Sequence, residues 1–184
     1  DYHFLTGAYE TSVPTVMGHE SAGIVEAVGE QVSYVSPGDH VITSLSVFCG
    51  HCEYCLSGRM VLCPHSDTMR PVDGVPRLSQ NGATIHQFSD VSSFAEQLLV
   101  HEHALVKISS EMPLQQAALI GCAVTTGLGA VFRTAGVRPG ETVAVIGCGG
   151  VGLSAIQGAR IAGAGRIIAI DVVNSKLDAA LGFG

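Results

Sequence analysis

The sequence predicts an α/β protein in two parts, a β-rich and barrel-like part followed by a parallel βαβ unit. Three observations lead to this prediction. Short apolar stretches separated by glycine and proline fill the first half of the chain. Four cysteines stand close together within Cys49–Cys63. A strand, a glycine-rich turn, a helix and a second strand follow one another from Thr142 to Asp171. We expect the two parts to be residues 1–123 and 124–184.

The first part should consist of short strands. Ser21–Val28 and His40–Val47 are rich in β-branched and apolar residues and are separated by turn signals. Phe94–Val100 and Ala104–Ile108 have the pattern of two more strands. The polar stretch 66–88 contains several prolines and glycines, so a long loop is expected there. Many short strands separated by turns favour a small barrel-like domain.

The second part alternates helices and buried strands. Met112–Ala118 and Thr125–Ala135 are predicted to be helical, the first with a proline near its first turn. Thr142–Ile146 and Arg166–Ile170 are apolar runs with the length of strands buried on both faces. With the helix between them they predict a βαβ unit and a parallel sheet.

Composition excludes several classes of protein. Hydrophobic residues make up 47% of the chain and charged residues 14%, which is typical of a globular domain. The net charge of −7 argues against a nucleic-acid partner. The absence of a long apolar run and of a leader pattern predicts a cytoplasmic protein with no membrane partner. Because the sequence begins at Asp1 and stops in mid-pattern at Gly184, we expect an internal fragment of a longer chain.

The four neighbouring cysteines predict a structural zinc site. Their spacing is C-x2-C-x2-C-x7-C, formed by Cys49, Cys52, Cys55 and Cys63. Four thiolates in a tetrahedron close the coordination shell, so such an ion supports the fold and does not catalyse. Disulfides are the alternative; they are disfavoured because nothing indicates secretion, and close C-x2-C pairs in intracellular chains more often bind metal or act in redox chemistry.

The glycine-rich turn GCGGVG predicts a dinucleotide site. Gly147 allows the tight turn, Gly149 lets the backbone approach a pyrophosphate, and Gly152 lets helix and strand pack closely. Free N–H groups at the helix start, where Gly150 and Val151 lie, hold the phosphates. Asp171, at the end of the next strand, would accept the ribose hydroxyls and repel a 2′-phosphate, which favours NAD over NADP. A glycine turn of a methyltransferase-like or ligand-free domain is the alternative.

Taken together, these motifs resemble the zinc-dependent, medium-chain alcohol dehydrogenases of the medium-chain dehydrogenase/reductase superfamily. The order and spacing that carry the resemblance are those of Gly18-His19-Glu20, the cysteine lobe, Gly121-Cys122 with Thr126-Gly127, and the turn Gly147–Gly152. The resemblance implies a GroES-like domain carrying two zincs per complete subunit, a Rossmann domain carrying NAD, and a homo-oligomer, either dimer or tetramer.

The resemblance also implies a second, catalytic zinc. His19 and Cys122 match two of its three protein ligands, and Glu20 matches the carboxylate beside the metal that can replace a ligand. The third ligand, a cysteine, and the hydroxyl residue that handles the substrate proton would lie just before Asp1. Taken alone, His19 has the pattern of a core or turn histidine and Cys122 that of an inert buried thiol. Only their joint placement favours a metal site.

Four further residues match family positions. Asp1 resembles the carboxylate that orients the histidine ligand, and His3 resembles the histidine that relays the proton to solvent. A histidine with a pKa of about 6.5 suits that task at neutral pH. Thr126 resembles a residue packed against the nicotinamide, and Lys176 one that contacts the adenosine ribose.

The resemblance implies an enzyme, an NAD-dependent zinc alcohol dehydrogenase that transfers a hydride between a small primary alcohol or aldehyde and NAD. One alternative is the branch that oxidises S-(hydroxymethyl)glutathione, which usually has tyrosine in place of His3 and an acidic residue near Tyr9. This interpretation assigns neither feature to the sequence and therefore favours simple primary alcohols. A noncatalytic, zinc-stabilised binding module is another alternative. The 184 residues alone are expected to be inactive and to bind NAD poorly.

Overall fold

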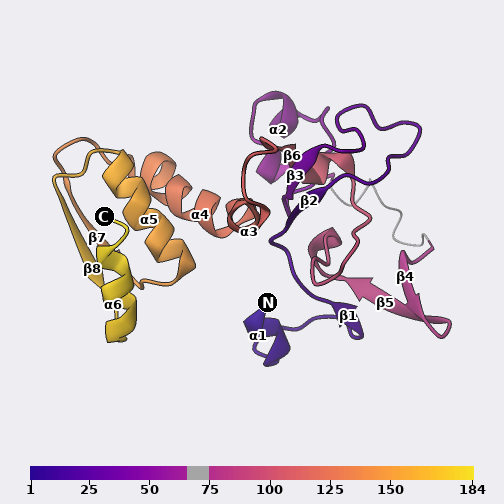
Figure 1. Ribbon diagram of the computed structural model, residues 1–184, viewed down its shortest axis with the longest axis horizontal. Coiled ribbons are helices and arrows are strands. Elements are labelled where there is room, and N and C mark those ends of the chain that lie inside the picture. Colours follow the sequence, from indigo (N-terminus) through magenta and orange to yellow (C-terminus); the bar gives the residue numbers. More distant parts are fainter. Residues whose placement is uncertain (66–74) are drawn as a thin grey trace. The chain divides into compact units, whose positions relative to one another are not determined.

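The computed structural model describes residues 1–65 and 75–184 (Figure 1). These residues form two compact units, residues 1–121 and 122–184. The domain boundary expected after residue 123 concerns the complete protein and stays a prediction. Among the described residues no single helix is long and apolar enough to span a membrane. Only the bent pair of segments 114–121 and 123–135 has the length and composition of a span, and only when the two are taken together.

The first unit holds two three-stranded sheets of short strands (Figure 1). In one, the strand order is β1-β5-β4, with β1 parallel and β4 antiparallel to β5. In the other, the order is β2-β3-β6 and both pairings are antiparallel. The strands are β1 Thr15–Val16, β2 Ala22–Ile24, β3 His40–Thr43, β4 Leu78–Gln80, β5 Ala83–Gln87 and β6 Leu105–Lys107.

Short helices connect these strands. None of the α-helices of the first unit exceeds four residues among those described, which is too short for helix propensity alone to hold them. The α-helices are α1 Tyr2–Leu5, α2 Glu53–Leu56 and α3 Leu114–Ala117, and the 3₁₀ turns are η1 Met60–Leu62, η3 Phe88–Asp90, η4 Glu102–Ala104 and η5 Ala118–Gly121.

The central strand β3 carries the packing of its sheet. Val41, Ile42 and Thr43 are all buried, which suits a strand with a neighbour on each side. The segment η5 lies close against it, since a Cβ on Gly121 would collide with the Thr43 carbonyl. Both strands predicted in this sheet from residues 21–28 and 40–47 exist, although they are shorter than expected.

Three expectations for the first unit need correction. No closed barrel is found in residues 1–65 and 75–121, where the six strands of two to five residues form two separate sheets. Phe94–Val100 is not a strand; Phe94 and Leu99 are largely exposed, and the segment pairs with no sheet of the described residues. The loop expected over 66–88 contains the hairpin β4–β5, while residues 66–74 lie outside the described part.

The second unit is a βαβ unit followed by a further helix (Figure 1). The parallel pair β7–β8 runs in register from Thr142 opposite Arg166 to Ile146 opposite Ile170, which confirms the two predicted strands. Burial alternates along both strands and Ile146 and Ile170 are exposed, so the expectation of strands buried on both faces is wrong. Helix α5 packs against both strands, and Val145, Cys148, Ile156 and Ala180 form the buried core. The elements are α4 Ala123–Gly129, the π-helical η6 Ala130–Ala135, β7 Thr142–Ile146, α5 Gly150–Ile161, β8 Arg166–Ile170 and α6 Asn174–Leu181.

Helices α4 and α5 approach each other very closely at Gly127. A Cβ at this position would lie 2.5 Å from Ser154 Cβ, 2.6 Å from the Val151 carbonyl oxygen and 2.7 Å from the Ala155 amide nitrogen. Glycine is therefore the residue that lets the two backbones meet here.

Candidate functional site

The four cysteines of the lobe Cys49–Cys63 gather around one point. All four sulfurs lie within 4.8 Å of one another. Thiolates about 2.3 Å from a zinc ion in a tetrahedron would be roughly 3.8 Å apart. The Sγ–Sγ distances are close to this value: 3.9 Å for Cys49–Cys55, 3.4 Å for Cys52–Cys55 and 3.8 Å for Cys52–Cys63. The donor set therefore fits a zinc ion.

No apolar core supports this lobe. No side chain of the helix α2 or the turn η1 is fully buried, and Leu56 and Val61 are largely exposed. Hydrogen bonding from the backbone of His51 lowers the pKa of Cys49 to about 6, whereas burial raises the pKa of Cys55 to about 11. At neutral pH, Cys49 therefore supplies a thiolate, and a metal must displace the proton of Cys55.

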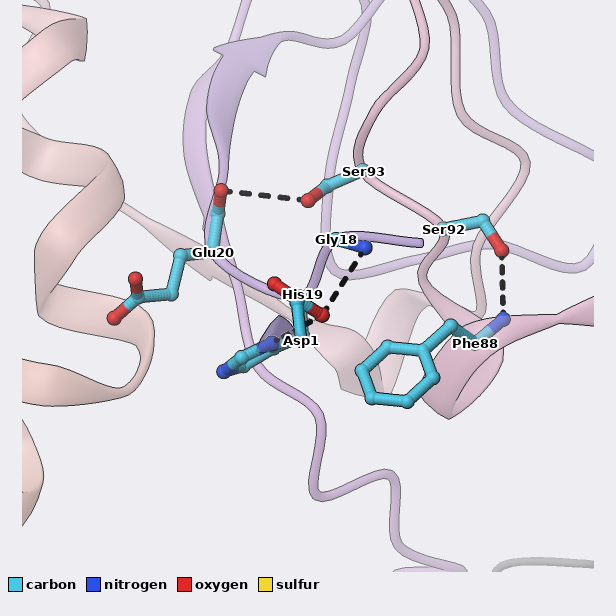
Figure 2. Close-up of polar contacts among 7 residues, drawn as sticks. All are labelled: Asp1, Gly18, His19, Glu20, Phe88, Ser92 and Ser93. Carbon is cyan, nitrogen blue, oxygen red and sulfur yellow. Dashed lines mark hydrogen bonds and ion pairs between the residues drawn. The ribbon is translucent and has the colours of Figure 1, made fainter. Parts of the chain in front are cut away.

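His19 is held in a fixed orientation by Asp1 (Figure 2). The Nδ1 atom of His19 lies 3.3 Å from Asp1 Oδ1, and the backbone N–H of Gly18 donates to the same carboxylate oxygen at 3.4 Å. This contact places the proton on Nδ1 and leaves Nε2 as the lone-pair atom that a metal can use. About a fifth of each of the two side chains is accessible to solvent. The structure thus brings together two of the predicted residues.

Glu20 and His3, the other residues expected at the catalytic site, also belong to the first unit. Glu20 follows His19 directly, and its backbone carbonyl accepts a hydrogen bond from Ser93 Oγ (3.4 Å). His3 is exposed in α1, and its ring centroid lies 5.4 Å from that of Tyr9. An imidazole in contact with solvent can exchange protons with water.

The turn between β7 and α5 has the geometry that its glycines predict. Gly147 has a φ of +91°, and a Cβ on Gly152 would collide with the Gly147 carbonyl. A Cβ on Gly149 would meet nothing within 4 Å. The turn therefore needs glycine at its first and last motif positions for its own folding, and leaves open space at the middle one.

Asp171 closes this turn from the end of β8. Its Oδ2 accepts from the Cys148 N–H at 2.7 Å, its Oδ1 accepts from the Val173 N–H at 2.9 Å, and only 6% of its side chain is exposed. These two hydrogen bonds, that from Cys148 above all, hold the pKa of Asp171 below its usual range. Lys176 Nζ stands 4.0 Å from Oδ2. The carboxylate is ionised and oriented, with lone pairs left for further donors.

Substitution of Asp171 by asparagine should destabilise the protein at neutral pH and much less in acid. The folded pKa is depressed, so the stabilisation is fully present above the unfolded pKa of about 3.9 and is lost as the pH falls through the folded value. Urea unfolding at neutral pH and near pH 3 measures the difference.

The matched control for this prediction is Asp178→Asn, on helix α6, because Asp178 is exposed and its carboxylate accepts no hydrogen bond found among the described residues. If the difference in the free energy of unfolding between Asp171→Asn and the wild type stayed constant with pH, the ionised Asp171 carboxylate would not be the source of the stabilisation.

The remaining predicted residues belong to the second unit. Cys122 immediately precedes α4, and its carbonyl accepts from the Thr126 N–H (2.9 Å) and from Thr125 Oγ1 (3.1 Å). Thr126 is exposed on that helix. Because His19 belongs to the first unit, a metal shared between His19 and Cys122 stays a prediction.

Comparison with known proteins gives the family. Residues 1–110 match the alcohol dehydrogenase GroES-like domain. The chain belongs to the zinc-dependent medium-chain alcohol dehydrogenase family. Among the curated family members, an S-(hydroxymethyl)glutathione dehydrogenase of Escherichia coli is 48% identical over 176 residues, which cover 93% of this chain and 47% of that protein.

Solved structures of alcohol dehydrogenases share the fold. An alcohol dehydrogenase zinc-binding domain protein from Burkholderia ambifaria is 39% identical with a TM-score of 0.90, and 99% of this chain covers 50% of that one. Benzyl alcohol dehydrogenase from Acinetobacter calcoaceticus is 33% identical with a TM-score of 0.85, and all of this chain covers 50% of it. The chain spans about half the length of these relatives.

The alcohol dehydrogenase motifs did not reveal every residue around His19. The ring of Phe88 lies 5.9 Å from that of His19 between centroids, and the segment after it contacts Gly18. These residues are some 70 positions away in sequence. A signal was nevertheless present nearby, because Asn81-Gly82 is a strong hairpin turn sequence and predicts strands on both sides of it.

Proposed function

We propose that the complete protein is a zinc-dependent oxidoreductase that transfers a hydride between an alcohol and NAD, with S-(hydroxymethyl)glutathione as its first candidate substrate. One observation carries the substrate: the 48% identity to S-(hydroxymethyl)glutathione dehydrogenases, which extends over 93% of the chain. This replaces small primary alcohols, the substrates that the motifs alone favoured.

Two residues bear on this choice. The prediction from the motifs assigned no acidic residue near Tyr9 and therefore disfavoured S-(hydroxymethyl)glutathione. Glu10 directly follows Tyr9 and is exposed, so this argument against that substrate is weak. His3 still stands where that branch usually has tyrosine. Together with the likeness to benzyl alcohol dehydrogenase, His3 keeps a simple primary alcohol as the second candidate substrate.

The proposed catalytic metal site uses Nε2 of His19 and the thiolate of Cys122, with Glu20 beside it. The fit is supported by His19, whose Nδ1 is taken by Asp1 and whose Nε2 has no hydrogen-bond partner found in the described part of the chain. When bound, zinc with such ligands supplies a Lewis acid that lowers the pKa of a substrate hydroxyl. Asp1 keeps the imidazole in the tautomer that this requires.

The remaining roles are assigned to groups near solvent and in the glycine turn. His3 takes the proton released by the substrate and passes it to water, because its side chain is exposed. The second unit is proposed to begin a Rossmann domain, in which N–H groups of Gly149–Gly152 hold the pyrophosphate and Asp171 binds the ribose. Thr126 would then lie against the nicotinamide and Lys176 against the ribose.

The test uses the complete subunit and the variant His19→Gln. The wild type should hold two zincs and reduce NAD with a mixture of formaldehyde and glutathione at a kcat/KM at least about tenfold above that with a primary alcohol. His19→Gln should lose one zinc and lower the turnover rate by at least about a hundredfold, since even outer-shell partners of a metal carry effects of up to that size.

The control is His86→Gln, at an exposed position of β5, which should keep both zincs and full turnover. A higher kcat/KM for primary alcohols would favour the second candidate substrate. One zinc per wild-type subunit without any NADH formation would contradict the proposed enzymatic function and favour a noncatalytic zinc-stabilised module.

A further inference from the structure

The segment Phe88–Ser93, which we term the 88–93 turn, has an unusual backbone. Ser89, Asp90 and Ser92 have φ values of +52°, +54° and +53°, in the left-handed region that non-glycine residues rarely adopt. Three such residues within four positions persist only where the surrounding contacts hold them, and such conformations concentrate at functional sites. The contacts of the 88–93 turn therefore indicate its role.

The turn is closed by Ser92. The side-chain Oγ of Ser92 accepts a hydrogen bond from the Phe88 N–H at 2.9 Å, and the Ser92 N–H donates to the Phe88 carbonyl at 3.0 Å. Ser92 is 3% exposed, and its neighbour Val91 is buried as well. This hydrogen bond is partly buried, so water would replace the lost acceptor only incompletely, and the Ser92 hydroxyl helps to hold Phe88 in position.

The closed turn contacts the segment that carries His19 (Figure 2). The Phe88 ring packs edge-on against the His19 imidazole, with centroids 5.9 Å apart and an interplanar angle of 60°, and against Phe4 of α1 at 5.0 Å. The imidazole is therefore fixed by Asp1 at Nδ1 and by an aromatic ring beside it.

Hydrogen bonds from Ser93 also restrain the residues before and after His19. The Ser93 N–H donates to the Gly18 carbonyl at 3.0 Å, and Ser93 Oγ donates to the Glu20 carbonyl at 3.4 Å. Gly18 has a φ of +96°, and a Cβ there would lie 2.5 Å from Ser93 Oγ. Glycine at position 18 therefore leaves the space that the side chains of Ser93 and Phe94 occupy against this segment.

We propose that Ser92 is a positioning residue for the metal ligand His19, acting through Phe88 and the 88–93 turn. This inference rests on the proposed function, because it concerns the metal that His19 would hold. Loss of the hydroxyl frees the Phe88 N–H, lets the ring move, and leaves His19 with Asp1 as its remaining restraint. The imidazole then presents Nε2 in a wider range of directions, which weakens metal binding.

The test compares Ser92→Ala with Ser89→Ala in the complete subunit. Both serines have φ near +52°, so both substitutions leave the same backbone strain, but Ser89 is exposed and its hydroxyl makes no hydrogen bond found among the described residues. Ser92→Ala should lower the affinity of the second metal site about tenfold, measured by competition with a chelator, and should change the d–d absorption of the Co²⁺-substituted site. Ser89→Ala should change neither quantity.

A second variant separates the hydroxyl from the backbone. Ser92→Gly adopts the left-handed conformation without strain, so it folds even where alanine does not, and it too should lose about tenfold in affinity. Wild-type affinity and an unchanged Co²⁺ spectrum in Ser92→Gly would overturn the inference, as would equal losses in Ser89→Ala and Ser92→Ala. One metal per wild-type subunit would overturn the proposed function as well. Two metals without NADH formation would overturn that function alone, because the affinity comparison between variants still tests Ser92.

Discussion

Replacement of Cys52 by serine is expected to remove one zinc per chain and to unfold the lobe Cys49–Cys63. Its sulfur lies 3.4 Å from that of Cys55 and 3.8 Å from that of Cys63, so it cannot be lost without opening the thiolate cluster. No side chain of α2 or η1 is fully buried, so the described part of the lobe has no hydrophobic core that can take over the role of the metal. Structural zinc binding in small domains contributes about 10 kcal/mol or more, so we expect a loss of at least about 4 kcal/mol in the free energy of unfolding.

Zinc content per chain, thermal unfolding and proteolysis within the lobe measure this effect. The control is Cys148→Ser, which changes the same side chain in the buried core of the second unit. It should keep the full zinc content and lower the free energy of unfolding by about 1–3 kcal/mol, because it changes a buried group of that core. If Cys52→Ser retained the wild-type zinc content and melting temperature, the cluster would not be a structural metal site.

The second large effect is expected from Gly152→Ala. Its Cβ would overlap the Gly147 carbonyl and lie 3.6 Å from Val145 Cγ1, so β7 and α5 would have to separate. Forcing atoms into a close-packed contact of this kind costs about 3 kcal/mol. We therefore expect both stability and NAD binding to fall, as measured by urea unfolding and by calorimetry on the complete subunit.

Gly149→Ala is the matched contrast, because a Cβ there meets nothing within 4 Å. As the N-cap of α5, this position should lose about 1 kcal/mol of stability or less on substitution. Its Cβ would point into the space that the proposed pyrophosphate occupies, so NAD affinity should still fall at least about tenfold. Equal effects of the two alanines on stability, or wild-type NAD affinity in Gly149→Ala, would contradict the proposed nucleotide site.

Local sequence was sufficient to predict the second unit. The strands Thr142–Ile146 and Arg166–Ile170 have the predicted bounds, because each is a continuous apolar run that ends in a turn. The position of Asp171 beside the glycine turn also follows from the βαβ connection, which places the ends of parallel strands at one edge of the sheet.

The first unit was predicted less well, because its short strands depend on distant partners. Phe94–Val100 has an apolar pattern, but the Phe94 N–H donates to the Met17 carbonyl and the segment joins no strand ladder within the described part of the chain. The hairpin β4–β5 was missed because its residues are polar, although Asn81 and Gly82 both have positive φ, as a tight hairpin turn requires. The 88–93 turn depends on Gly18 and His19, and no local pattern gives that pairing.

The close approach of α4 and α5 at Gly127 bears on the mechanics of the site. Cys122 precedes α4 and the glycine turn precedes α5, so the proposed metal ligand and the proposed phosphate cradle sit on two helices that touch through their backbones at this point. A layer of side chains could deform and absorb a displacement; direct backbone contact is much stiffer. A shift of one helix is therefore transmitted to the other, so the Cys122 thiolate and the glycine turn should move together.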